Sequence, residues 1–238
     1  MSQHSSNEGK KVKVEAMFND IAPKYDFLNH FLSLGIDIQW RKKVRRLIAP
    51  LQPKHILDIA TGTGDLAIEL VKLKPEKIVG LDIAANMLEI GEEKIKAKKL
   101  DHIIEMQLGD SEDLPFEDNS FDAVTVAFGV RNFENLQKGL HEMHRVLKPG
   151  GMAAILEFSK PKAFPFRQIY NFYFRYILPP LGRIISNNKE AYTYLPESVS
   201  AFPEDTAFLK ELEKAGFKDN NQKRLTMGIA TLYRASKK

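Results

Sequence analysis

The chain has 238 residues, of which 43% are hydrophobic and 28% are charged. That composition excludes a disordered or fibrous protein, and the length suits one large domain or two small ones. The sequence has no cysteine, which excludes disulfides, thiolate metal sites, cysteine nucleophiles and Cys-held iron–sulfur clusters. The net charge of +4 is too small to indicate a nucleic-acid partner.

The N-terminal part of the chain shows no export signal. It lacks the apolar core of a signal peptide, and no run reaches the roughly 18 apolar residues of a spanning helix, so we expect a cytoplasmic protein. Residues 1–10 are expected to be a disordered lead, and residues 11–50 a helical lid. Apolar spacing predicts lid helices on either side of Pro23. A third helix is expected to start at Asp37, as its N-cap, and to end at Pro50.

Short apolar runs alternate with helical patterns after residue 50. This alternation predicts βαβ units, hence an α/β fold with a mostly parallel sheet and helices on both faces. Two further runs near the C-terminus predict a hairpin that closes the sheet. The seven expected strands are 55–60, 77–82, 103–108, 121–128, 152–158, 217–225 and 228–234, with helices at 65–73, 85–98, 134–147 and 204–214.

Residues 164–200 interrupt this alternation and are expected to form a cap within a single domain of residues 1–238. The stretch 164–186 holds 7 of the 23 aromatic residues, with Arg167, Arg175 and Arg183 at eight-residue steps. Aromatic residues at helical spacing usually form a core, but this composition also suits a membrane interface. The basic cluster at 41–46 is expected to be a solvated helix face, or else to assist such docking.

The clearest local motif is the turn Asp58-Ile-Ala-Thr-Gly-Thr-Gly-Asp65 after the first strand. Glycines there let the backbone approach a ligand closely, as at the carboxyl ends of strands in nucleotide-binding folds. Gly62, Gly64 and Ala67 also match a dinucleotide fingerprint, and Asp82 stands where a ribose-binding acid belongs. The turn alone therefore leaves an NAD site open.

Two further acids favour a different ligand. Asp58 would repel a pyrophosphate but attract an ammonium group, and Asp110 with Ser111 follows the third strand, within reach of an adenine edge. Acids after the first three strands suit a ligand that carries an amino group, a ribose diol and an adenine, which describes S-adenosylmethionine. A structural role stays open for each single acid, because Asp is common at strand ends and N-caps.

Specific motifs then follow in order, including Phe128-Gly-Val-Arg-Asn132, Glu157-Phe-Ser159 and Tyr194-Leu-Pro-Glu-Ser198. Through these motifs the chain resembles the class I methyltransferases and, more narrowly, the ubiquinone/menaquinone biosynthesis C-methyltransferase family. The resemblance covers about residues 14–234. Departures are few, and Asp37 in place of a common His weakens the case for a base at that position.

This resemblance implies a Rossmann-like methyltransferase fold with S-adenosylmethionine as cofactor. It places Thr63 at the methionine end, Asp82 on the ribose hydroxyls, and Asp110 with Ser111 beside the adenine. The complete expected cofactor site is Asp58, Gly62, Thr63, Gly64, Asp82, Asp110, Ser111 and Ala127.

The resemblance also implies C-methylation of a polyprenylated quinol precursor, first 2-demethylmenaquinol and alternatively the ubiquinone precursor. A hydroquinone ring carbon becomes nucleophilic when a phenolic hydroxyl loses its proton. Arg131 is expected to stabilise the phenolate or orient a water, because guanidinium groups stay protonated in proteins. Asn132 is expected to hold the second hydroxyl, with help from Tyr25, Asp26 or His30 of the lid.

Other functions remain alternatives at this point: methylation of another small phenol or lipid, RNA methylation, a dehydrogenase, or a scaffold without catalysis. No metal is expected, because His141-Glu-Met-His144 lacks the i, i+4 spacing of a zinc helix. The expected partners are the quinol, a membrane surface and a second copy of the chain in a homodimer, without nucleic acid.

Overall fold

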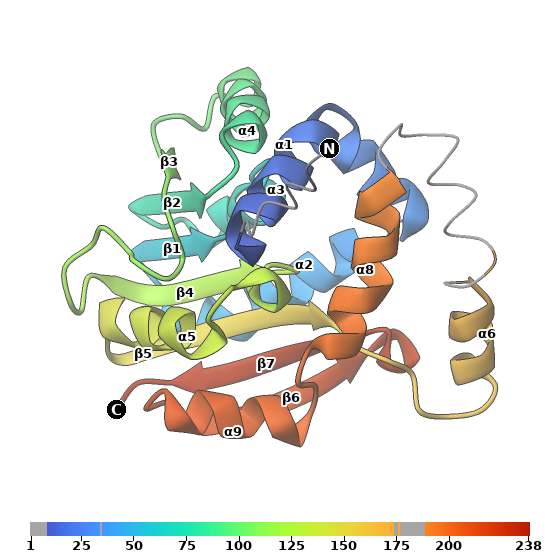
Figure 1. The fold of residues 1–238 in the computed structure, drawn as a ribbon. Helices are drawn as coiled ribbons and strands as arrows, with labels where there is room; N and C mark the ends of the chain where they lie inside the picture. The colour runs from blue at the N-terminus through green and yellow to red at the C-terminus, as the bar shows by residue number, and fades with distance from the viewer. Residues whose placement is uncertain (1–8, 34, 174–175, 177–188) are drawn as a thin grey trace, which may run out of the picture.

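The computed structural model describes residues 9–33, 35–173, 176 and 189–238. Its centre is a seven-stranded sheet in the order β3-β2-β1-β4-β5-β7-β6 (Figure 1). The first five strands in this order are parallel, and β7 is antiparallel to both of its neighbours. The expected sheet with its C-terminal hairpin is therefore confirmed. The strands are β1 (His55–Ile59), β2 (Lys77–Asp82), β3 (Ile104–Leu108), β4 (Phe121–Ala127), β5 (Leu147–Phe158), β6 (Lys218–Leu225) and β7 (Ala230–Ser236).

Helices cover both faces of the sheet because successive strand residues point to opposite sides. Leu57 and Ile59 of β1 share one core with α5 (Leu136–Val146) and α9 (Thr206–Lys214). Ile56, between them, belongs to the opposite core. That core contains residues of α2 (Ile36–Ile48), α3 (Asp65–Leu70) and α4 (Ala85–Ala97). The described residues also form four short 3-10 helices: η1 (Ala49–Leu51), η2 (Val71–Leu73), η3 (Val130–Asn132) and η5 (Thr226–Gly228).

The strand order reverses between β1 and β4, which lie side by side. Chain segments leaving these two strands turn in opposite directions along the sheet, and the crevice between them is where ligands bind in open α/β sheets. The glycine turn leaves β1 at this point, and η3 leaves β4. The topology thus brings the two main sequence motifs together.

The N-terminal helix α1 (Lys10–Leu32) lies across the carboxyl ends of the parallel strands (Figure 1). Two helices separated by Pro23 were expected, but α1 continues through this proline. Because Pro23 has no N–H, the carbonyl of Asn19 loses its helical donor. Asn86 Nδ2 donates to that carbonyl instead, at 3.1 Å. This replacement bond, which also ties α1 to α4, explains why the helix tolerates the proline.

The prediction that Asp37 caps a helix is wrong. Helix α2 starts at Ile36, after Gly35 with a φ of 72°, and Asp37 is already inside its first turn. The Asp37 carboxylate accepts hydrogen bonds from Ser33 Oγ and Arg41 Nη2, both at 2.5 Å. It therefore binds the turn before α2 and a side chain within α2 instead of the free amides of its own helix.

The cap region contributes α6 (Phe166–Phe172) and α8 (Lys189–Ala201). Arg175 and Arg183, which entered the expected aromatic pattern, lie outside the described residues. Helix α6 stands apart from the sheet in Figure 1, whereas α8 lies close to the ends of the parallel strands. None of the helices in the described part of the chain combines the length and hydropathy needed to cross a membrane.

Candidate active site

A cleft opens at the carboxyl ends of the central strands, with α1 forming one wall. It has about 700 Å³ of free space, open solvent at its mouth included. Apolar walls come from α1 and from the strand ends, including Phe18 and Leu81. Seven of the residues expected from the sequence line it: Tyr25, Gly62, Asp82, Asp110, Ser111, Ala127 and Asn132.

Asp82 is an acid of the cleft that two backbone amides hold in place. Its Oδ2 accepts a hydrogen bond from the Gly62 amide at 2.8 Å, and its Oδ1 accepts one from the Ala84 amide at 2.9 Å. Burial raises the pKa of Asp82, although these amides oppose the shift. Each carboxylate oxygen keeps a second lone pair. The group is therefore rigidly presented and can still accept hydroxyl hydrogens from a ligand.

Two glycines make the crevice possible. Gly62 has a φ of 57°, a conformation that is strained for residues with a side chain. Gly129, just after β4, passes the end of β1 so closely that a Cβ there would lie 2.4 Å from the Cβ of Ala60. The β1 and β4 loops can meet at the floor of the cleft only because that position is glycine.

Two lysines tie the start of α1 to both rims of the cleft. Lys11 forms an ion pair with Asp110. Although burial opposes ionisation, hydrogen bonds from Lys11 and from the Glu112 amide lower the pKa of Asp110. Lys10 Nζ donates to the carbonyls of Arg131 and Phe133 at 3.0 and 2.7 Å, and burial lowers its pKa. These contacts hold α1 over the cleft, in the position expected for a lid.

Asp58 does not line the cleft. It is 1% exposed, and its two carboxylate oxygens accept hydrogen bonds from Thr125 Oγ1 at 2.6 Å and Thr61 Oγ1 at 2.7 Å. Burial raises the pKa of Asp58 to about 6 despite these bonds. The structure thus places this acid beneath the glycine turn, where it supports the turn from below.

Replacing Asp58 by asparagine is expected to stabilise the fold at pH 8. Because the folded-state pKa of about 6 exceeds the ordinary value of 3.8, the neutral carboxyl contributes stability below pH 3.8 that is lost as the pH rises through 6. Ionisation of this group costs about 3 kcal/mol. We expect Asp58→Asn to raise the free energy of unfolding by about 1–3 kcal/mol at pH 8, with a smaller gain at pH 5. Urea unfolding at both pH values measures the difference.

Asp122→Asn is the matched control. Although burial opposes ionisation, Lys148 and the amides of His55 and Lys54 lower the pKa of Asp122. Its ionised form therefore stabilises the fold at pH 8, and the substitution should weaken it there. A loss of stability at pH 8 in both variants would contradict the account of Asp58.

Thr63 is also turned away from the cleft. Its hydroxyl donates to Asp26 Oδ1 at 2.5 Å, and Lys94 Nζ of α4 lies 2.6 Å from Asp26 Oδ2 and 3.0 Å from the Thr63 hydroxyl. Gly64, the next residue, is likewise absent from the cleft lining. The second half of the glycine turn therefore serves as an attachment point for α1.

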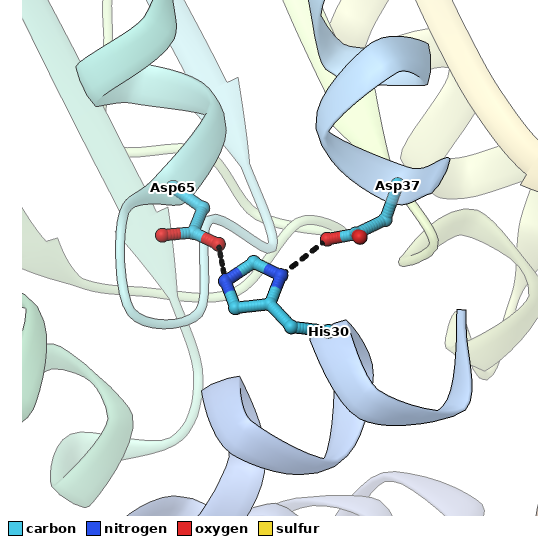
Figure 2. A group of neighbouring side chains, drawn as sticks. All are labelled: His30, Asp37 and Asp65. Atoms are coloured by element: carbon cyan, nitrogen blue, oxygen red, sulfur yellow. Dashed lines mark hydrogen bonds and ion pairs between the residues drawn. The ribbon is translucent and has the colours of Figure 1, made fainter. Parts of the chain in front are cut away.

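A second polar cluster joins α1, α2 and α3. Figure 2 shows the His30 imidazole between two carboxylates, with Nδ1 2.8 Å from Asp37 Oδ2 and Nε2 3.5 Å from Asp65 Oδ2. The three side chains are close enough together to suggest a metal site. However, Arg41 Nη2 lies 2.5 Å from Asp37 and 2.9 Å from Asp65. This guanidinium already supplies the positive charge that a metal ion would bring.

These ion pairs change the interpretation of the basic cluster at 41–46. Arg41 is 9% exposed, and Arg45 pairs with Glu69 at 2.8 Å. Two of its five cations are therefore neutralised by carboxylates within the protein, so the cluster as a whole is not the solvated basic face that was expected.

Arg131 lies behind the cleft wall. Its Nη1 is 2.8 Å from Oε1 of Glu157, whose side chain is fully buried, and it also donates to the Phe128 carbonyl. The guanidinium carbon lies 5.4 Å from the centre of the Phe158 ring. Its neighbour Asn132 lines the cleft directly. Of the two residues expected to be catalytic, only Asn132 borders the cleft.

The cleft fits S-adenosylmethionine better than a dinucleotide. Asp82, the expected partner of the ribose hydroxyls, lines the cleft, as do Asp110 and Ser111. The acids Asp82, Asp110, Glu112 and Glu134 surround the cleft and suit a cationic ligand. In addition, the Gly62 amide already donates to the Asp82 carboxylate. A pyrophosphate would need this amide as a hydrogen-bond donor.

Comparisons with known proteins decide the family. The model of the ubiE/COQ5 methyltransferase family matches residues 5–237. The chain belongs to this family. It is therefore an S-adenosylmethionine-dependent methyltransferase, as the sequence motifs predicted.

Several relatives match over almost their whole length. The chain is 48% identical to the demethylmenaquinone methyltransferase of Bacteroides fragilis, over 98% of this chain and 96% of that protein. It is 45% identical to the ubiquinone/menaquinone biosynthesis C-methyltransferase UbiE of Geotalea daltonii, over 96% of this chain and 97% of that protein.

Solved structures agree on the fold. A SAM-dependent methyltransferase from Thermotoga maritima has a TM-score of 0.65 at 20% identity, covering 94% of this chain and 99% of its own. The [4+2]-cyclase SpnF has a TM-score of 0.66 at 16% identity, covering 97% of each chain. At these identities the likeness shows the fold alone, and a cyclase among the matches illustrates that fold does not determine reaction.

Sequence reasoning assigned no separate role to several polar residues of the site. Glu157 carried a usable signal, because it is an acid at the carboxyl end of β5, like the acids that follow β1, β2 and β3. Ser198 belongs to a motif that was visible in the sequence, but its contact was not, and Lys94 carried no signal, because helix residues far along the chain reach the site only through the tertiary fold. Ser198 Oγ lies 3.3 Å from Arg131 Nε.

Proposed function

We propose that this methyltransferase transfers a methyl group to a ring carbon of a polyprenylated quinol precursor, 2-demethylmenaquinol in the first place. The observation that carries the proposal is the 48% identity, over nearly the full length of both chains, to the demethylmenaquinone methyltransferase of Bacteroides fragilis. The cleft supports it, because apolar residues and hydrogen-bonding groups line the same space.

S-adenosylmethionine supplies an electrophilic methyl group. We propose that Gly62, Asp82, Asp110, Ser111 and Ala127 hold it in the cleft, while Asp58, Thr63 and Gly64 maintain the turn below. Acidic groups near the site also favour the cationic form of the cofactor over its neutral-sulfur product.

The chain's own residues must raise the nucleophilicity of the quinol. Asn132 borders the cleft and holds one quinol oxygen. Arg131, neutralised by Glu157, acts through directed N–H groups instead of net charge, and it stabilises the phenolate or orients the water that accepts its proton. We keep both as the proposed catalytic residues; because only Asn132 borders the cleft, the proposed contact of Arg131 with the phenolate or the water has to form when the quinol binds.

The ubiquinone precursor is the second candidate substrate. It is supported by the 45% identity to the Geotalea daltonii protein, which is named for both pathways. Competition between reduced, short-tailed forms of the two quinols in one reaction tests the choice. We expect methyl incorporation into the menaquinone precursor to dominate, and dominant incorporation into the ubiquinone precursor would reverse the order.

We propose that α6 lets the enzyme contact an anionic bilayer, where a polyprenylated substrate resides. Phe166, Ile169, Phe172 and Tyr176 follow helical spacing and are 38%, 60%, 57% and 58% exposed, whereas Tyr170 at the edge of this stripe is 9% exposed. An exposed apolar stripe beside a cation such as Arg167, also exposed, is typical of helices that lie in a membrane interface.

Flotation with liposomes tests the proposed contact of α6 with the bilayer. The double variant Ile169→Glu/Phe172→Glu is expected to reduce binding to phosphatidylglycerol vesicles at least fivefold, because two charges would enter the apolar region. Activity on a short-tailed quinol should stay within twofold. Met227→Glu, at an equally exposed apolar residue in η5, is the matched control and should float like wild type. Equal flotation of wild type, the double variant and the control would contradict the proposed membrane contact.

Three further expectations from the sequence stay predictions. They are the cytoplasmic location, the homodimer and the division into lead, lid and cap. Sedimentation at several protein concentrations, with and without cofactor, addresses the dimer.

A further inference from the structure

Helix α8 contacts the loop that carries the two proposed catalytic residues. Tyr194 and Ser198 are four residues apart and so lie on one face of α8. Tyr194 OH donates to Asn132 Oδ1 at 3.0 Å, and Ser198 Oγ lies 3.3 Å from Arg131 Nε. One helix face thus engages two consecutive residues of η3.

The contact to Asn132 determines which end of its amide is available. An asparagine side chain has an acceptor oxygen and a donor NH2 group. Tyr194 binds the oxygen, so the NH2 group is the end left to meet a ligand in the cleft that Asn132 lines. Burial raises the pKa of Tyr194, which keeps its hydroxyl protonated and able to donate.

We propose that Tyr194 is a positioning residue that fixes Asn132 as a hydrogen-bond donor to the quinol oxygen on which negative charge develops, instead of to the second hydroxyl expected from the sequence. This inference rests on the proposed function. A donor strengthens its bond as negative charge develops on that oxygen, whereas the amide carbonyl would repel the charge. Without Tyr194 the amide is free to turn over, and the site loses the distinction between donor and acceptor.

Tyr194→Phe keeps the ring and removes the hydroxyl. On whichever quinol the wild-type enzyme methylates, kcat is expected to fall about tenfold, the cost of weakening one preorganised donor. The pH at which the rate reaches half its maximum should rise by about one unit, because the phenolate is less stabilised. The dissociation constant for S-adenosylhomocysteine should stay within twofold.

A double-mutant cycle separates positioning from direct action. If Tyr194 acts through Asn132, the tenfold loss should shrink to less than twofold in an Asn132→Ala background. Tyr233→Phe is the control: Tyr233 OH accepts from the Asp205 amide at 3.0 Å, so this variant should lower thermal stability and leave kcat unchanged.

Three outcomes would overturn the inference. Tyr194→Phe could leave kcat and its pH profile unchanged. The loss could be equally large without Asn132, which would mean that Tyr194 acts independently of it. Methyl transfer by wild type to neither quinol would refute the proposed function, and with it this inference, whereas the first two results leave the proposed function intact.

Discussion

Arg131→Lys is expected to lower kcat for quinol methylation about 100-fold while leaving cofactor affinity within threefold. Lysine can keep the ion pair with the fully buried Glu157, so the fold should survive. It cannot also maintain the guanidinium contacts with Ser198 Oγ and the Phe158 ring. Losing directed N–H donors at a site of developing charge typically costs 100-fold or more in rate. Single-turnover methyl transfer and calorimetric titration with S-adenosylhomocysteine measure the two quantities.

Lysine is preferable to alanine at this position for a physical reason. Arg131→Ala would leave the Glu157 carboxylate buried without its partner, which costs about 3–5 kcal/mol and confuses lost activity with lost folding. The pair Arg131→Met/Glu157→Gln removes both charges and provides the control. Near-wild-type kcat in either variant would show that Arg131 only joins η3 to β5.

Asp82→Asn is expected to weaken binding of S-adenosylmethionine and of S-adenosylhomocysteine equally, by about 100-fold. Asp82 accepts hydrogen bonds from the amides of Gly62 and Ala84. Asparagine can satisfy only one of them and presents an NH2 group to the other. A lost charged hydrogen bond costs about 1.5–3 kcal/mol, and the ribose would lose its acceptor as well. Because both ligands contain the same ribose, their affinities should fall together.

Two comparison variants sharpen this test. Asp110→Asn should have a smaller effect, because Asp110 is partly exposed and already paired with Lys11. Asp101→Asn, at an exposed position after α4, should have none. Loss of affinity for S-adenosylmethionine alone would mean that Asp82 responds to the sulfonium charge instead of the ribose.

The sequence predicted the part of the site that depends on local pattern. Gly62 and Asp82 follow from the rule that glycine turns and acids gather at the carboxyl ends of parallel strands, and both line the cleft. The same rule predicted that Asp58 would meet the ligand, whereas the structure shows it bonded to Thr61 and Thr125. The rule locates the end of a strand but not the direction in which a side chain leaves it.

Long-range contacts were beyond local pattern. The partner of Thr63 is Asp26, which is 37 residues away, and Asn132 meets Tyr194, 62 residues away. The motif that contains Tyr194 was visible in the sequence, but its place beside η3 arises only when α8 packs against the sheet. Pro23 is the converse case. Proline usually ends a helix, but here Asn86 donates to the carbonyl that the proline leaves without a donor, and the helix continues.

The central claim is methylation of carbon in a quinol ring, and product analysis tests it most directly. The wild-type protein would be incubated with methyl-labelled S-adenosylmethionine and chemically reduced, short-tailed 2-demethylmenaquinol, and the labelled position located by mass spectrometry. The account predicts one methyl group on the ring carbon between the hydroxyl-bearing carbon and the prenyl-bearing carbon. A methyl group on oxygen, or no transfer to this quinol or to the ubiquinone precursor tested in parallel despite measurable cofactor binding, would contradict it.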